Sequence, residues 1–566
     1  MILGNKFMRK VIEYKFLIFI LIIGSFLLFF NLGTNRYLNG DSANEGLLAK
    51  SICSCGLPNH WDGKNIFADA YGNEFKRVGN YYILSHHPWL HLYVIAASYL
   101  LLGRTAFSTL FPGALVALFT IFLSYFFAIK ISRDKEIAII TTLLLLLSVQ
   151  FLLFGRGDRY YALIALFTLL MLYFYLKFLE DKKGSMIGFG ISAILFFHSN
   201  YVPFIAVMGG IMTHFFLFEF KKERLKSILL SLLTISLFTT PWILFFHPSS
   251  SVIQSWSSLG AYNSIKEFLF VFTHTLLKIN NHLFPFLLFV LVPFIMIKRT
   301  GHKLVVNNRY ILILLVICFI LLTFLLHDVG RSFNSMIPLF CLLSASIYKF
   351  IKGKNRIIAY VFLILLLFTN IINVTPTILF KSCISTNNFA NIISFIIHGD
   401  KEKVLEKLKE RDAEKKIEEY AKIKFLICDF LYEITHDYDN AIEGIIKYLQ
   451  KYGKKDETVM IRCVEGLASN IIFYTGMKVI YKVSDNEVLF PPTEDFLKLN
   501  QMPPRGIDWY IKIPSEPLDY MPEGKYEKII IDYPETVFDN YPFLPSHQFK
   551  TLNDGPKVVI YHKMND

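Results

Sequence analysis

The chain has 566 residues, of which 54% are hydrophobic, and 55 of them are phenylalanine. Soluble domains are about 45–50% apolar, so this excess excludes an ordinary soluble protein. The net charge of +13 does not indicate nucleic-acid binding, because lysine and arginine are concentrated in short loops between apolar runs. Positive charge in such loops fixes the orientation of a membrane protein. We therefore expect an α-helical polytopic membrane protein.

Apolar runs of membrane-spanning length follow one another through the first two-thirds of the chain. A bilayer core of about 30 Å needs roughly 20 apolar residues. The first run, 15–32, follows several basic residues and lacks a small-residue cleavage site, so we expect a retained helix with a cytoplasmic N-terminus. The run at 90–102 is short, which predicts an interfacial helix. Further spans are expected at 106–130, 136–154, 159–179, 185–198, 201–220, 227–246, 281–297, 309–327, 333–350 and 357–376.

The basic loops agree with this arrangement. By the positive-inside rule they lie in the cytoplasm, and they alternate correctly only if 90–102 does not cross the membrane. The chain then has eleven spans in the cell membrane, with its C-terminus outside the cytoplasm. The basic loops are 130–135, 182–183, 221–226, 298–303 and 349–356.

The composition divides the chain into two parts. Residues 1–376 are expected to form the transmembrane domain, in which the first outer loop, 33–105, is the richest in chemically active side chains. From 377 to 566 the composition is that of a water-soluble domain outside the cytoplasm. Residues 388–453 have a helical pattern, and short apolar runs then alternate with a helix from about 457 onward. This alternation predicts a small α/β domain.

The loop that follows the first span contains "GDSANEGLLAKS", in which Asp41 and Glu45 are four residues apart. This spacing puts both carboxylates on one face of a helix. In one interpretation Asp41 caps that helix and Glu45 favours its first turn. In the other, a carboxylate beside bound phosphate acts as general base on an acceptor hydroxyl or amine.

This motif resembles the first loop of GT-C class membrane glycosyltransferases, in the branch of protein O-mannosyltransferases and aminoarabinose transferases. The pattern of that branch reads roughly D-E-A-x-Y-A-x-x-A-R. Asp41 takes the position of the invariant aspartate, whereas Ser42 replaces the second acidic residue and Glu45 stands where an aromatic residue is frequent. The resemblance implies that Asp41 is the catalytic base and places Glu45 among the candidate substrate contacts.

Two further segments resemble motifs of the same class. "SHHPWLHL" is similar to the H-P-P-L-x-x-x-L helix, with Trp89 in place of the second proline, and makes His87 a candidate phosphate contact. The alternative for His87 is an interfacial histidine with ordinary partners. "GRSFNSMIPLF" resembles the late R-Y-L-L-P-x-x-P motif, with Ser332 where tyrosine is usual, and implies that Arg331 binds the donor.

"GRGDRYYAL" resembles the S-R-x-x-R-x-Y-A-L start of a helix, on which Arg156, Arg159 and Tyr161 align. Arginine binds phosphate in a bidentate manner, so the resemblance implies a site for a lipid-linked phosphate. The alternative is an anchor at the outer interface, with Asp158 as ion-pair partner of the arginines.

The resemblance implies a GT-C fold and an inverting transfer of a sugar. The expected donor is a polyprenyl-phosphate sugar, and the acceptor is a lipid, glycan or protein on the outer face of the membrane. The other partners are membrane lipids, and nucleic acid is excluded. No cofactor is predicted, and a need for a divalent metal is left open. Two alternatives remain, a surface-polysaccharide ligase or polymerase and a polytopic lipid or glycan transporter.

Overall fold

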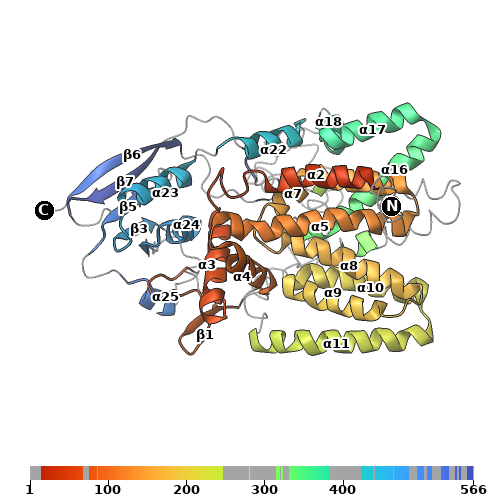
Figure 1. Cartoon of the computed structure of the whole chain (residues 1–566), viewed down its shortest axis with the longest axis horizontal. Coiled ribbons are helices and arrows are strands. Elements are labelled where there is room, and N and C mark those ends of the chain that lie inside the picture. The colour runs from red at the N-terminus through yellow and green to blue at the C-terminus, as the bar shows by residue number, and fades with distance from the viewer. Residues whose placement is uncertain are drawn as a thin grey trace, which may run out of the picture.

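The protein is described by a computed structural model in which an elongated helical bundle meets a smaller domain that contains a β-sheet (Figure 1). All structural statements below concern the described residues, which are 14–67, 75–85, 87–246, 279–280, 314–318, 320–322, 331–381, 422–437, 440–462, 465–482, 494–501, 506–512, 524–534, 542, 544, 547–549 and 557–564.

The bundle is built from apolar helices that run mainly along the long axis of the molecule (Figure 1). Helix α5 is central, because it packs against α2, α6 and α8. The bundle contains α2 (Lys15–Phe29), α5 (Ala106–Ser132), α6 (Lys135–Leu146), α7 (Val149–Gly155), α8 (Tyr161–Leu179), α9 (Ser185–Ser199), α10 (Tyr201–His214), the π-helix η1 (Phe215–Glu219), α11 (Lys222–Phe246), the 3₁₀ helix η2 (Ser332–Met336), α16 (Ile337–Lys354), α17 (Arg356–Phe368) and α18 (Ile371–Lys381).

Within the described residues, five helical segments are long and apolar enough to cross a membrane, and a sixth is gained if the bent pair α6 and α7 counts as one span. The expected run at 281–297 lies outside the described residues, and only parts of 309–327 are described. The multi-pass architecture is therefore confirmed, whereas the number eleven stays a prediction. The five segments are Ala106–Ser132, Tyr161–Leu179, Tyr201–Glu219, Lys222–Phe246 and Ser332–Lys354.

Two runs that were expected as single helices are interrupted. The run at 136–154 bends by 64° between α6 and α7. On α7 the Gln150 side chain donates to the carbonyl of Pro542 and accepts from the N–H of Leu544. Helix α7 is therefore held by a segment near the C-terminus of the chain. The run at 357–376 is interrupted between α17 and α18, where the side chain of Asn370 accepts from the N–H of Lys424. Tertiary hydrogen bonds thus override the hydropathy pattern at both places.

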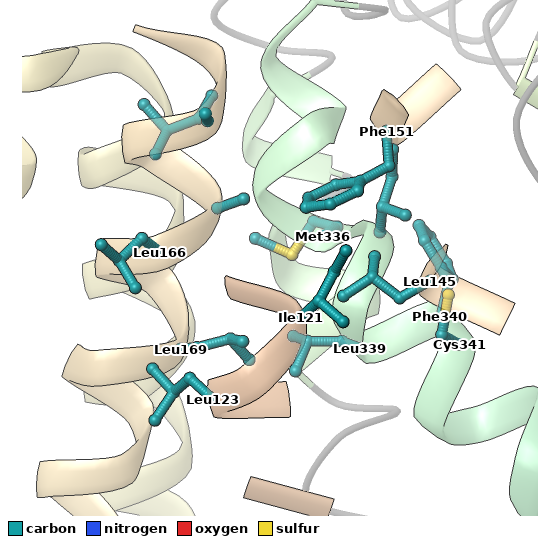
Figure 2. Close-up of a cluster of buried hydrophobic side chains, with 14 of the residues drawn as sticks. Ile121, Leu123, Leu145, Phe151, Leu166, Leu169, Met336, Leu339, Phe340 and Cys341 are labelled. Carbon is teal, nitrogen blue, oxygen red and sulfur yellow. The ribbon is translucent and has the colours of Figure 1, made fainter. Parts of the chain in front are cut away.

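Large apolar side chains fill the interior of the bundle. Figure 2 shows Ile121 of α5, Leu145 of α6 and Phe151 of α7 gathered against Met336 and Leu339. All five are buried, and Met336 and Leu339 have no exposed surface. Such close packing holds the ends of α7 and α8, and the loop that joins them, in fixed positions.

The C-terminal domain has a mixed five-stranded sheet in the order β4-β3-β5-β7-β6. Strand β3 is parallel to β4 and β5, and β7 is antiparallel to β5 and β6. The expected α/β character is confirmed, although the short strand β5 was not predicted. The elements are α22 (Leu426–Thr435), α23 (Ala441–Tyr452), β3 (Thr458–Arg462), α24 (Glu465–Thr475), β4 (Lys478–Lys482), α25 (Glu494–Leu499), β5 (Trp509–Lys512), β6 (Tyr526–Pro534) and β7 (Lys557–Lys563).

Helices α3 (Gly40–Cys55) and α4 (Leu90–Leu102) lie between the bundle and this domain (Figure 1). Helix α3 packs against both α4 and α24. Between them in sequence lies a hairpin of β1 (Phe75–Val78) and β2 (Tyr81–Leu84). The run at 90–102 therefore forms the short separate helix that its length predicted, at the end of the bundle.

Helix α3 approaches its two neighbours closely at Gly46. A Cβ atom at this position would lie 2.8 Å from the ring of Phe473 on α24 and 2.8 Å from the hydroxyl of Tyr99 on α4. We expect Gly46→Ala to lower the free energy of unfolding by about 1–3 kcal/mol through overpacking. Thermal unfolding in detergent measures this effect.

Gly190 provides a matched control for that substitution. It is also helical, but a Cβ atom there would meet nothing within 4 Å. Gly190→Ala should leave stability unchanged or raise it by up to about 1 kcal/mol, because alanine is the better helix former. Equal losses in the two variants would contradict close packing of α3 on α24.

The segment that enters α3 is held by backbone hydrogen bonds to the C-terminal domain. The N–H of Tyr37 donates to Glu443 Oε1 at 3.0 Å, and the N–H of Leu38 donates to the Tyr474 hydroxyl at 2.9 Å. The Asn35 side chain donates to the carbonyl of Glu433 at 2.8 Å. The C-terminal domain therefore helps to fix where α3 begins, although it is about 400 residues away in sequence.

Glu443 gives this contact a pH dependence. Burial raises the pKa of Glu443 to about 7. A carboxyl whose pKa is raised by folding stabilises least when it is ionised, so the free energy of unfolding should fall by up to about 3 kcal/mol between pH 4.5 and pH 7. Glu443→Gln should remove this decline and raise the melting temperature above pH 7. If Glu443→Gln has the same melting temperature as wild type at both ends of this pH range, Glu443 does not cause the decline in stability.

Candidate active site

The N-terminus of α3 presents Asp41 without using it as a cap. Asn39 is the N-cap residue, and its side chain accepts from the N–H of Ser42 at 2.7 Å. The Asp41 carboxylate instead lies 2.9 Å from Arg159 Nη2, and 30% of the side chain is exposed. The interpretation of Asp41 as a helix cap is therefore wrong, because Asn39 has that role.

The loop between α7 and α8 supplies both predicted arginines, but they point to different places. Arg159 faces Asp41, whereas Arg156 Nη1 donates to the carbonyls of Leu27, Leu28 and Phe30 at 3.0–3.2 Å. Carbonyls at the C-terminus of a helix lack intrahelical donors and carry partial negative charge. Arg156 thus caps the end of α2. Burial lowers the pKa of Arg156 to about 9, and the nearby charge of Arg36 adds to this shift.

Asp158 lies between these arginines in sequence and turns toward α3. Its carboxylate accepts a short hydrogen bond from the Ser42 hydroxyl, and only 6% of the residue is exposed. Burial raises the pKa of Asp158 to about 6, and the negative charge of Glu45 adds to the effect. The sequence predicted Asp158 only as an ion-pair partner of the arginines. The structure instead places its carboxylate against Ser42, the residue that stands at the second acidic position of the motif.

Glu45 is buried and surrounded by groups that favour its charged form. Glu45 Oε2 lies 3.0 Å from His91 Nε2, and Oε1 lies 3.5 Å from His87 Nε2 and 3.7 Å from Arg159 Nε. Burial alone would raise the pKa of Glu45, but His91, His87 and Arg159 outweigh it and hold this pKa well below its usual range. The interpretation in which Glu45 only favours the first turn of the helix is therefore wrong, because Glu45 is buried among charged groups.

His91 is a site residue that sequence analysis missed. It is 2% exposed, and it follows His87 by four residues where α4 begins. Tyr160, which was also missed, packs edge-on against both imidazoles, with ring centroids 6.4 Å from His87 and 5.8 Å from His91. The available signal was that His91 follows His87 closely in the same segment, although only His91 is on α4.

Arg331 lies near the same place, since it interacts electrostatically with Asp41 and Arg159. It directly precedes η2, which packs against α8, and Asn334 of η2 donates to the carbonyl of Tyr161 at 2.5 Å. Burial would lower the pKa of Arg331, but Tyr161 and Asp41 raise it, while the positive charge of Arg159 opposes them. Arg159 and Arg331 are thus two guanidinium groups beside the single carboxylate of Asp41. Their positive charge stabilises an added anion.

The structure therefore brings together six of the seven residues predicted from sequence, because Arg156 instead caps α2. The Tyr161 ring packs against Phe154, with centroids 4.4 Å apart, and Tyr161 also interacts electrostatically with Arg159 and Arg331. The six are Asp41, Glu45, His87, Arg159, Tyr161 and Arg331.

Residues 86–245 match the family model described as Dolichyl-phosphate-mannose-protein mannosyltransferase. No curated protein sequence matches the chain. The crystal structure of ArnT from Cupriavidus metallidurans bound to undecaprenyl phosphate superposes with a TM-score of 0.55 at 14% identity, covering 88% of this chain and 93% of that one. The chain has the GT-C fold.

Two other structures are similar. The apo state of ArnT gives a TM-score of 0.54 at 14% identity, over 89% of this chain and 93% of that one. The archaeal oligosaccharyltransferase AglB from Archaeoglobus fulgidus, in complex with an inhibitory peptide and a dolichol-phosphate, gives 0.49 at 11% identity, over 89% and 69%. The family model and the two ArnT structures confirm the resemblance to GT-C glycosyltransferases that was inferred from four short motifs. The enzyme class expected from it, a glycosyltransferase with a lipid-phosphate sugar donor, agrees with the family model and with the ArnT fold.

Proposed function

We propose that this GT-C protein transfers a sugar from a polyprenyl-phosphate-linked donor to an acceptor, with inversion at the anomeric carbon. The observation that carries the proposal is the pair formed by Asp41 and Arg159 at 2.9 Å, with Arg331 close enough to interact with both. It places one partly exposed carboxylate beside two cations that suit a phosphate. The family model over residues 86–245 and the ArnT structure with undecaprenyl phosphate support this assignment.

The proposed reaction is a single displacement. Asp41 accepts the proton of the acceptor hydroxyl or amine as the acceptor attacks the anomeric carbon. The bond between that carbon and the phosphate oxygen breaks, and the electron pair leaves with the polyprenyl phosphate. Arg159 and Arg331 stabilise the negative charge that develops on the phosphate, and His87 assists them. One displacement inverts the configuration, so a single base and a cationic clamp suffice.

We also propose the arrangement of the chain in the membrane. The chain crosses eleven times with its N-terminus in the cytoplasm, and residues 1–376 form the transmembrane domain. The site, which includes the loop 33–105, and the domain 377–566 then lie outside the cytoplasm. There the acceptor is a lipid, glycan or protein. The packing of α24 against α3 supports a role for the C-terminal domain beside the site.

For Arg156 and Tyr161 the contacts favour support of the site over donor binding. Arg156 ties the end of α2 to the loop before α8, and Tyr161 fills the space beside Phe154. Donor contacts are assigned to Arg159, Arg331 and His87, with Glu45 acting through the charged groups that it contacts.

Turnover of a defined donor tests the proposal. The purified protein is incubated in detergent with a panel of radiolabelled polyprenyl-phosphate sugars and a crude membrane extract as acceptor. Release of polyprenyl phosphate, together with label in the extract, is the expected result. If no donor is consumed by folded protein, the enzyme assignment is wrong and a transporter of lipids or glycans becomes the better interpretation.

A further inference from the structure

Glu45, His87 and His91 form a compact set of metal-ligating atoms. One ligand atom from each residue lies within 4.8 Å of the other two, and no second group of this kind occurs among the described residues. Glu45 lies on α3, His91 lies in the first turn of α4, and His87 lies just before α4 begins. All are inside the protein, since Glu45 is 3%, His91 1% and His87 14% exposed at the side chain.

The distances within this set suit a tetrahedral ion. Zinc binds histidine nitrogen and carboxylate oxygen at about 2.0–2.2 Å, which puts neighbouring ligand atoms roughly 3.4 Å apart. The two oxygens of Glu45 lie 3.0 Å and 3.5 Å from the imidazole nitrogens. An ion could therefore be accommodated with only small movements of the three side chains.

The Glu45 carboxylate supplies a buried negative charge for a cation at this place. Arg159, 3.7 Å from Glu45 Oε1, is also paired with Asp41 at 2.9 Å. A buried charge needs compensation, and neutral imidazoles ligate a metal without adding charge of their own.

We infer that Glu45, His87 and His91 bind one divalent transition-metal ion, for which zinc is the best match. Two imidazole nitrogens and one carboxylate oxygen are a ligand set that zinc uses with its fourth position open. Carboxylate and imidazole together exclude the soft thiolate-binding ions and disfavour calcium and magnesium, which prefer oxygen ligands. The inference about metal binding needs no assumption about the reaction.

The role of the ion rests on the proposed function. Arg159 lies 3.7 Å from Glu45 and 2.9 Å from Asp41, so the ion stands beside the assigned donor site. Its open position accepts an anionic oxygen of the donor phosphate, so that His87 assists the leaving phosphate through the ion. In this way the ion adds positive charge at the point where the leaving phosphate becomes more negative.

Metal content and cobalt spectra test the inference independently of turnover. The purified full-length protein is stripped with chelator, reloaded with zinc sulfate or cobalt chloride, dialysed and analysed by elemental mass spectrometry. We expect one zinc ion per chain, and visible absorption bands of four-coordinate cobalt. Glu45→Gln and His91→Ala should weaken binding by more than the roughly 10–100-fold that outer-shell changes cause. His87→Asn, at the most exposed of the three side chains, serves if the buried variants unfold.

His547→Ala is the matched control. His547 Nε2 lies 2.9 Å from Glu433 Oε2, so this buried pair has the geometry of the His91–Glu45 pair, but it belongs to no set of three ligands among the described residues. Its loss should leave the metal content unchanged. Wild-type protein that retains no metal, or ligand variants that retain as much as wild type, would overturn the inference. Zinc binding without turnover of any donor would uphold the metal site and count only against the proposed function.

Discussion

Replacing Asp41 by asparagine should reduce sugar transfer by about 10²–10⁴-fold, the contribution typical of a general base. An amide has nearly the shape of the carboxylate but cannot accept the acceptor proton at neutral pH. The cap of α3 should be unaffected, because Asn39 supplies it. The rate of polyprenyl phosphate release, measured with the donor that wild type consumes, gives the effect.

Asp495→Asn controls for the loss of a carboxylate in an ion pair with arginine. Asp495 pairs with Arg77 at 3.0 Å, and the Arg77 side chain is 51% exposed. An exposed pair of this kind contributes little to stability, so its loss should leave turnover unchanged. If Asp41→Asn retains more than about a tenth of wild-type turnover, Asp41 is not the base.

Arg159→Met should reduce turnover by about 10²–10³-fold, because it removes a charged donor aimed at the leaving phosphate. Stability should fall as well, since Asp41 and Glu45 each lose a cation. Arg159→Lys restores the charge but not the planar fork, so it should recover part of the activity. The rate per folded molecule, with the folded fraction taken from thermal unfolding, separates the two effects.

Arg156→Met is the matched variant in the same loop. The substitution leaves the carbonyls of Leu27, Leu28 and Phe30 without their donor, which should lower the free energy of unfolding by about 1–3 kcal/mol. The rate per folded molecule should stay close to wild type. A loss of rate in Arg156→Met as large as that in Arg159→Met would show that both arginines bind the donor.

Much of the fold could be predicted from local patterns. Hydropathy located helices such as α5, α8 and α16, and the alternation of short apolar runs indicated β3, β4, β6 and β7. The interruptions could not be predicted, because their causes are hydrogen bonds over long sequence separations. Gln150 binds the backbone near Pro542, and Asn370 binds a segment more than 50 residues later.

Residues of the candidate site could be predicted where a short sequence motif contains them. Asp41 and Arg159 were identified from "GDSANE" and "GRGDRYY", and the structure places them in contact. The sequence could not predict that Arg156 caps α2 while Arg159 faces Asp41. The packing of α2 against the loop between α7 and α8 decides which arginine has which role. His91 was missed because its importance depends on Glu45, which approaches from another helix.

Binding of polyprenyl phosphate tests the central claim most directly, because it needs neither the sugar nor the acceptor to be known. Native mass spectrometry or equilibrium binding in detergent would compare wild type with Arg159→Met combined with Arg331→Met. We predict that wild type and Arg156→Met bind the lipid alike, whereas the combined variant binds at least about 10-fold more weakly, since each charge-assisted hydrogen bond contributes about 1.5–3 kcal/mol. Equal binding by the combined variant and wild type would contradict a donor-phosphate site beside Asp41.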